Sequence, residues 1–307
     1  MVTARNGRIP MTDIKMRYFN NLHPAVSMCY FVCVLVLTLT CMHPVTVLLS
    51  AIGAGLFSLR LRGKKAFLGT MRFVGPMFLF ISIANPLFNH RGVTMLFLFM
   101  NQWITLEAIV YGVVSACSLA AVILWFTCYQ EVMTSDKFLF LFGQIAPAAS
   151  LLITMTLRFI PQLQNNAADI QESQKMLREE DTRLFQKIGT ALRNLSALLT
   201  MSMEHAVETA DSMKARGFGG RRRTTFHLFH FDGRDARVLG MILILTGICV
   251  AARVYGHGHM EYYPAMTPFL LGGPSITMFV VFGLLMLMPS MLEIKEALVW
   301  QSYGLKN

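Results

Sequence analysis

The residues best suited to chemistry form a short run at the end of a candidate helix, Ala215-Arg216-Gly217. The guanidinium of an arginine presents a planar fork of donors that pairs bidentately with a carboxylate. The small residues on either side leave this fork accessible, so Arg216 could enter a pocket on another molecule. The alternative is structural, because a cation in the last helical turn also suits the helix dipole, and Gly217 is a typical helix stop.

Other reactive side chains form weaker patterns. Cys29 and Cys33 have the one-turn spacing that two metal ligands on a helix need, but all six cysteines lie in apolar stretches and none forms a CxxC pair. Such cysteines are typical of small buried apolar residues. His257 and His259 could together contact a metal ion, although histidines in a Gly-rich loop are more often simple loop residues. We therefore predict no metal site and no cofactor.

The sequence lacks the motifs of the common enzyme classes. It has no GxxxxGK[ST] loop to cradle a nucleotide, no HExxH and no GxSxG. Glu107 and Glu131 lie near the ends of apolar segments, which argues against a proton relay through a membrane core. We predict a protein that is not itself an enzyme.

The elements that must position Arg216 belong to a membrane protein. Of 307 residues, 54% are hydrophobic and 14% are charged, with a mean hydropathy of +0.51, whereas soluble domains are about 25% charged. The net charge of +10 then reflects membrane topology rather than binding to nucleic acid. No charged residue occurs from Tyr18 to Leu59, too long a stretch for a cleaved signal peptide, so we expect retained membrane helices.

Apolar segments predict an all-α, polytopic membrane bundle of about six spans. We expect a tight helical hairpin of 25–41 and 44–59, followed by a basic loop over 60–72. The further spans are expected at 73–88, 106–128, 238–254 and 269–289. The apolar piece 93–104 could be re-entrant. The segment 138–157 is interrupted by Gly143 and Pro147, and we place it at the cytoplasmic interface or half-inserted.

Between the spans lies a polar insert. Residues 158–237 hold 13 Lys or Arg and 10 Asp or Glu, and apolar periodicity predicts three amphipathic helices at 162–178, 184–201 and 203–216. These helices could pack on the bundle, under the membrane or against a partner. The chain thus divides into N-terminal transmembrane helices over 1–157, a cytoplasmic insert over 158–237, and a C-terminal transmembrane hairpin and tail over 238–307. Placing the Lys- and Arg-rich segments inside makes both termini cytoplasmic.

Four strings, taken in order, resemble the transmembrane T component of energy-coupling factor (ECF) transporters, which includes membrane subunits of cobalt-type uptake systems. They are Asn85-Pro-Leu-Phe-Asn-His-Arg-Gly92, Ile104-Thr-Leu-Glu-Ala-Ile-Val-Tyr-Gly112, Leu157-Arg-Phe-Ile-Pro161 and Met213-Lys-Ala-Arg-Gly-Phe218. The similarity covers most of the chain.

The resemblance implies a coupling subunit of the cell membrane. In this family two cytoplasmic ABC ATPases hydrolyse ATP, a small membrane S component captures a vitamin or metal ion, and the T component links them through two Arg-centred motifs. Ala215, Arg216 and Gly217 match the second motif. The first falls at Leu177-Arg178-Glu179, where a typical member has Ala-Arg-Gly or Ala-Arg-Ser.

A second hypothesis comes from another functional class. A self-sufficient secondary transporter or channel binds its solute near the midplane of the bilayer, between broken helices. The Asn85-Pro86 break and Pro147 are compatible with that architecture. The sequence does not name a transported substrate under either hypothesis.

Overall fold

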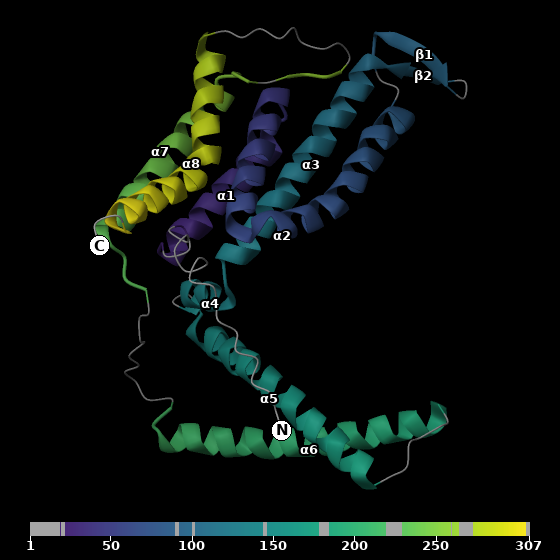
Figure 1. Ribbon diagram of the computed structural model, residues 1–307, viewed down its shortest axis with the longest axis vertical. Coiled ribbons are helices and arrows are strands. Elements are labelled where there is room, and N and C mark those ends of the chain that lie inside the picture. Colours follow the sequence, from purple (N-terminus) through teal and green to yellow (C-terminus); the bar gives the residue numbers. More distant parts are fainter. Residues whose placement is uncertain are drawn as a thin grey trace. The chain divides into compact units, whose positions relative to one another are not determined.

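The computed structural model describes residues 19, 22–89, 92–99, 102–143, 146–177, 184–218, 229–258, 260–263 and 273–304. Within these ranges the chain forms eight helices and one two-stranded hairpin (Figure 1). Their order is α1 Pro24–Thr40, α2 Pro44–Phe88, β1 Met95–Phe99, β2 Gln102–Thr105, α3 Leu106–Val132, α4 Ser135–Gly143, α5 Pro147–Leu177, α6 Leu184–Ala215, α7 Gly233–Val254 and α8 Gly273–Gly304. Two compact units result, one from Met1–Lys137 with Phe229–Asn307 and one from Phe138–Leu228.

Four described helices are long and apolar enough to cross a membrane. The qualifying stretches are Pro44–Phe88, Leu106–Val132, Gly233–Val254 and Ser275–Lys295, and α1 is an additional apolar helix of 17 residues. The prediction of an all-α polytopic membrane protein is therefore confirmed. The number of six crossings and the cytoplasmic position of the termini stay predictions.

A single glycine divides α2 into two arms. Gly63 has φ 78° and ψ 169°, outside the helical region, while the residues on both sides of it are helical. A Cβ at Gly55 would lie 4.0 Å from Cε2 of Phe67, although a straight helix separates positions twelve residues apart by about 18 Å. The arms therefore fold back on each other (Figure 1). The basic loop predicted over 60–72 is wrong in extent, since helix continues on both sides of Gly63.

Aromatic rings and a few paired polar groups form the core of the bundle. Trp125, Tyr30 and Phe57 are fully buried. The indole of Trp125 donates to Oγ of Ser50 at 3.0 Å, and Ser50 also pairs with the hydroxyl of Thr38 at 2.9 Å. The Tyr30 hydroxyl donates to a main-chain carbonyl of α8 at 3.2 Å. These bonds satisfy buried polar groups where water is excluded and connect α1 with α2, α3 and α8.

Glycines allow the helices to approach closely. A Cβ at Gly53 would lie 2.9 Å from Cβ of Met286 on α8, and one at Gly112 would lie 3.1 Å from both Cβ of Asn85 and the carbonyl of Ser82 on α2. Small residues at such crossings are a common packing device in membranes. Asn85 and Gly112 belong to two of the strings that suggested the family, so these strings have a packing role.

The segment between α2 and α3 differs from its prediction. Residues 93–104 contain an antiparallel pair, in which Phe97 to Phe99 of β1 lie opposite Ile104 to Gln102 of β2, and the register shifts between Met95 and Phe97. Whether this apolar piece is re-entrant stays a prediction. Glu107 is buried and accepts a hydrogen bond from the Thr94 amide at 3.2 Å. A Cβ at position 92 would lie 2.6 Å from Oε2 of Glu107. Gly92 is therefore required for this carboxylate to hold the base of the hairpin.

The second unit is built mainly from α5 and α6, which contact each other. Helix α5 joins the apolar residues before 158 to the predicted helix 162–178, and it is not among the four candidate spans. Helix α6 unites the two helices predicted over 184–201 and 203–216, so the prediction of a break between them is wrong. The depth of 138–157 in the membrane stays a prediction.

The close crossing at Gly112 predicts a stability defect. Gly112→Val should lower the thermal midpoint of the detergent-solubilised protein, because the added atoms push α2 away from α3, and overpacking of this kind costs about 1–3 kcal/mol. Gly75→Val on α2 is the control, since no heavy atom lies within 4 Å of its Cβ position. Equal midpoints for the two variants would show that this crossing does not limit stability.

Candidate functional site

The Arg216 segment forms the C-terminal turn of α6. The amide of Phe218 donates to the carbonyl of Met213 at 3.0 Å, and that of Gly217 donates to Lys214 at 3.0 Å. Gly217 has φ 77°, the left-handed conformation that glycine adopts without a Cβ penalty. This pair of bonds and this φ define a Schellman motif, with Gly217 just past the helix and Arg216 at its C-cap.

The tip of α6 is open to solvent. Ala215, Arg216, Gly217 and Phe218 are all exposed. The structure therefore brings together the three predicted residues of the second motif and adds Phe218, 45% exposed, which the sequence reasoning did not single out. A signal for Phe218 existed, because a hydrophobic residue commonly follows the glycine of a Schellman turn.

Local sequence leaves the Arg216 guanidinium without an acidic neighbour on its own helix face. The positions three and four residues before it, which are its helical neighbours, hold Met213 and Ser212. No salt bridge to Arg216 occurs among the residues that the structure describes, whereas Glu208 pairs with His205 at 3.5 Å. The fork is therefore held at a helix end, where the dipole favours a cation, with its donors available to an external carboxylate.

The other predicted coupling residue, Arg178, lies outside the described residues. Helix α5 ends at Leu177, directly before it. The distance between Arg178 and Arg216 is therefore not part of the described structure.

Helix α6 has three distinct faces. One row of half-buried residues recurs every four positions, Thr190, Asn194, Leu198 and Ser202, and His205 and Met213 are half-buried further along the helix. A second, polar face carries Arg193 and Glu204, both exposed. The third face is an apolar stripe, which we define as seven residues that are 51–89% exposed: Phe185, Ile188, Leu192, Leu195, Leu199, Met203 and Val207.

The distribution of these faces is the opposite of ordinary core packing. The half-buried row of α6 holds three polar residues and one leucine, Leu198, whereas the apolar stripe is exposed within its own unit. A contiguous exposed apolar surface of this kind marks an interaction with a protein or a membrane. Because α6 is one continuous helix, the apolar stripe and the Arg216 tip belong to one rigid element.

Cys29, Cys33, His257 and His259 are the other residues that the sequence offered as possible metal ligands. No group of three or more His, Cys, Asp or Glu side chains is placed to hold a metal ion within the described part of the chain. Cys29 and Cys33 are both free thiols. His257 is half-buried in a turn, and His259 lies outside the described residues.

Comparison with known proteins finds relatives among membrane proteins of energy-coupling factor transporters. The energy-coupling factor transporter transmembrane protein EcfT of Lacticaseibacillus paracasei is 30% identical over 107 residues, which cover 34% of this chain and 40% of that protein. EcfT 1 of Listeria monocytogenes is 31% identical over 107 residues, with the same coverage. EcfT of Bacillus selenitireducens is 30% identical over 110 residues, covering 35% of this chain and 41% of that protein. The matched region thus spans about two fifths of each curated relative.

The family profile gives wider coverage than these pairwise matches. The profile described as CbiQ, cobalt transport protein, matches residues 17–227. That range includes the α2–α3 crossing, the hairpin, α5 and the whole of α6 with its Arg216 tip. The chain belongs to the CbiQ cobalt transport protein family.

Proposed function

We propose that this chain is the transmembrane coupling subunit, or T component, of an ECF-type ABC importer. In this role it links ATP hydrolysis by two partner ATPases to uptake of a vitamin or metal ion through a small membrane S component. The relatives are named energy-coupling factor transporter transmembrane proteins, which supports a membrane subunit of such an importer. The observation that carries the proposal is the arrangement on α6, where an exposed Arg216 tip and an unused apolar stripe share one helix.

Arg216 is the residue that we propose to dock on an ATPase. Its guanidinium can form two parallel hydrogen bonds to a carboxylate in a groove, and such bidentate, charge-assisted pairs are strong and directional. The adjacent Ala215 and Gly217 add little bulk, so the tip can enter a narrow groove. Arg178 is the second docking residue in this proposal, supported by its place just after α5.

The apolar stripe is the surface that we propose to contact the S component. Burial of apolar side chains against a hydrophobic partner is non-directional, so one stripe can accommodate partners of different shape. Methionine adds adaptability because its side chain is unbranched and flexible. A stripe of this kind supports repeated docking better than a network of specific polar contacts.

The mechanism follows from the rigidity of α6. Its 32 residues extend over about 48 Å. When ATP closes the ATPase pair, a groove that holds Arg216 moves, and the helix carries that displacement to the apolar stripe. The S component then tilts or shifts in the membrane. This chain supplies no catalytic group and no substrate site, and both termini lie on the cytoplasmic side with the ATPases.

The docking role predicts a specific failure for Arg216→Glu. The reversed charge repels the carboxylate that the guanidinium would pair with, and loss of a buried charge pair costs about 2–5 kcal/mol. The variant should insert into membranes but lose at least about tenfold in copurified ATPase and lose ATP-driven uptake. Arg193→Glu, on the exposed polar face of the same helix, is the matched control. Wild-type ATPase recovery and uptake by Arg216→Glu would refute docking at this tip.

A separate experiment addresses the secondary-transporter hypothesis: uptake by this chain alone in liposomes would favour it.

The left-handed turn at the end of α6 predicts a second, conformational defect. Gly217→Val should weaken ATPase association without changing the charge, because a β-branched residue at φ 77° costs about 1–2 kcal/mol and loosens the turn. Gly217→Asn should retain more association, since Asn tolerates this conformation. Gly189→Val is the control, as Gly189 lies in open space on the same helix without a positive φ. Association equal to wild type in Gly217→Val would show that the turn does not hold Arg216 in its docking position.

The apolar stripe predicts a defect that affects the S component and spares the ATPases. Leu195→Glu should reduce copurification of the S component while the ATPases remain bound, because the charge must be desolvated at an apolar contact. Ala197→Glu places the same charge among exposed residues on the polar side of α6 and should retain the S component. If Leu195→Glu loses the ATPases and keeps the S component, the apolar stripe contacts the ATPases and the proposed contact with the S component is refuted.

A further inference from the structure

The hairpin between α2 and α3 carries apolar side chains that the described part of the bundle leaves exposed. Val93, Met95 and Leu96 are 65%, 61% and 51% exposed. No Lys, Arg, Asp or Glu occurs from Gly92 to Leu106, although a segment that faces water normally carries charged side chains. The proposed coupling role uses none of these residues, so this apolar surface calls for a separate explanation.

The base of the hairpin is fixed to the start of α3. The Leu106 amide donates to the carbonyl of Thr94 at 3.1 Å, and the Thr94 amide donates to the buried Glu107 carboxylate at 3.2 Å. Leu106 begins one candidate membrane span and Phe88 ends another. In the view of Figure 1 the hairpin runs across the direction of α3 rather than continuing it. The hairpin is therefore held sideways at the ends of two spans.

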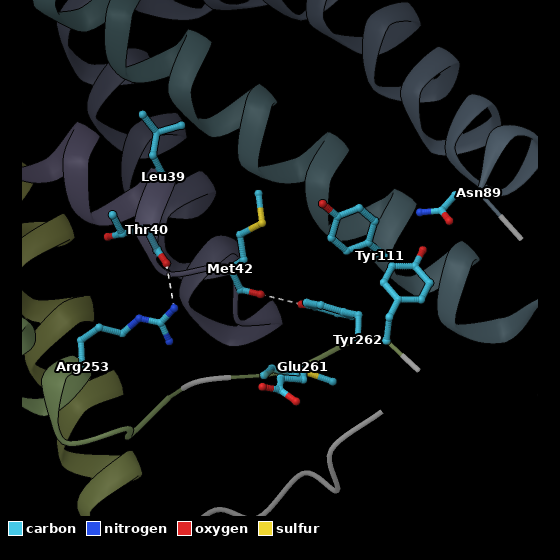
Figure 2. Close-up of a pocket in the computed structure, with 10 residues that line it drawn as sticks. Leu39, Thr40, Met42, Asn89, Tyr111, Arg253, Glu261 and Tyr262 are labelled. Carbon is cyan, nitrogen blue, oxygen red and sulfur yellow. Dashed lines mark hydrogen bonds between the residues drawn. The ribbon is translucent and has the colours of Figure 1, made fainter. Parts of the chain in front are cut away.

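A pocket at the same end of the bundle marks the boundary with water. Its lining includes Asn89, the C-cap of α2, and Tyr111 on α3, together with Arg253 and Glu261 (Figure 2). Arg253 lies in the last turn of α7. Charged side chains near the ends of spans reach the membrane surface, and tyrosine is enriched at the same level. Asn89 closely precedes Gly92 in the chain, so the hairpin begins at this level.

The main chain of the hairpin excludes a position deeper in the membrane. The sheet has only the strands β1 and β2 in the described part of the chain, so each strand has an outer edge without a strand partner. Hydrocarbon offers these edges no hydrogen bonds, and open sheet edges in contact with lipid do not occur there. In water, the exposed apolar side chains would be uncovered, which is unfavourable. The headgroup region meets both requirements, since it offers water to the edges and acyl carbon to the side chains.

The apolar surface of the hairpin continues that of the two spans. Leu87 and Phe88 at the end of α2 and Leu106 at the start of α3 are all exposed. Because α2 and α3 are membrane helices, exposed apolar side chains at their ends meet lipid. The hydrogen bond from Leu106 to Thr94 places the first strand beside this lipid-facing surface. Strand β2 also includes Trp103, a residue type that is enriched at membrane–water interfaces.

We propose that the hairpin lies in the interfacial layer of the bilayer, with Val93, Met95 and Leu96 against the acyl chains and the strand edges among the headgroups. The register shift between Met95 and Phe97 interrupts the strict alternation of side chains along β1, and Met95 and Leu96 are both exposed there. The partner of this surface is the lipid bilayer and not a protein. Held in this way, the hairpin fixes the depth at which α2 ends and α3 begins.

The test is depth-dependent quenching of a fluorophore in reconstituted vesicles. The full chain, with its native cysteines replaced, carries Leu96→Cys labelled with the fluorophore, in phosphatidylcholine brominated either near the headgroup or near the ends of the acyl chains. Interfacial elements bury their apolar side about 5–10 Å into the boundary between headgroups and acyl chains. The label at position 96 should therefore be quenched more strongly by the shallow bromines than by the deep ones.

Two matched positions calibrate the depth. Ile244 is 64% exposed in the middle of α7, a candidate span, so a label on Ile244→Cys should be quenched more strongly by the deep bromines. Asp211 is exposed near the solvent-open end of α6, so a label on Asp211→Cys should be quenched by neither lipid. Met95→Cys is a second hairpin position, and it should behave as Leu96→Cys does. Because both hairpin side chains are exposed, their replacement should leave the fold intact.

Three results would overturn the proposal. Labels at 95 and 96 that neither lipid quenches, while the label at 244 is quenched, would place the hairpin in water. Stronger quenching of the hairpin labels by the deep bromines would place it in the hydrocarbon as a re-entrant segment. In a third arm the labelled chain is reconstituted with its copurified partner chains, and loss of quenching only in that complex would identify a protein, rather than lipid, as the partner of this surface.

Discussion

Lipid hydrocarbon offers no hydrogen-bond partner to a protein, and this constraint organises the membrane unit. Each helix satisfies its own main chain, so the apolar stretches of the sequence become helices rather than loops. Buried polar side chains must then find partners inside the bundle, as Trp125, Ser50 and Thr38 do. Since lipid is as apolar as leucine, tight packing rather than water exclusion holds the helices together, and the close approaches at Gly53 and Gly112 follow from that requirement.

The same constraint distinguishes α6 from the spans. A helix with exposed charges along one face and exposed leucines along another fits neither hydrocarbon nor water on all sides. The chain packs α6 through its small polar residues, such as Asn194 and Ser202, and so leaves the apolar stripe for another surface. Uncovered apolar side chains are unfavourable in water. The stripe is therefore best explained as half of an interface whose other half is supplied by a different molecule.

Sequence patterns predicted the parts of the structure that depend on local physics. Apolar length located α3 and α7 to within a few residues, and Gly217 located the end of α6. The errors arose where tertiary context decided: Arg and Lys around Gly63 suggested a loop, yet both are good helix formers, and a single positive φ provides the whole turn. Amphipathic spacing predicted helices over 184–201 and 203–216 but could not tell which face of α6 the chain itself would cover. Residues 95–105 were too short and too apolar for periodicity to separate strand from helix.

The energetics of the α6 tip explain why an arginine there can serve a partner rather than its own helix. Interaction with the helix dipole contributes about 0.3–1 kcal/mol at an exposed end and is screened by salt. A desolvated bidentate pair with a carboxylate is worth more, about 1.5–7 kcal/mol where such pairs have been measured at interfaces. Met213 and Ser212, where an acidic residue would otherwise compete, offer no carboxylate. The dipole therefore stabilises the guanidinium at the tip in the free protein, and in the proposed docked state an external carboxylate would add the stronger interaction.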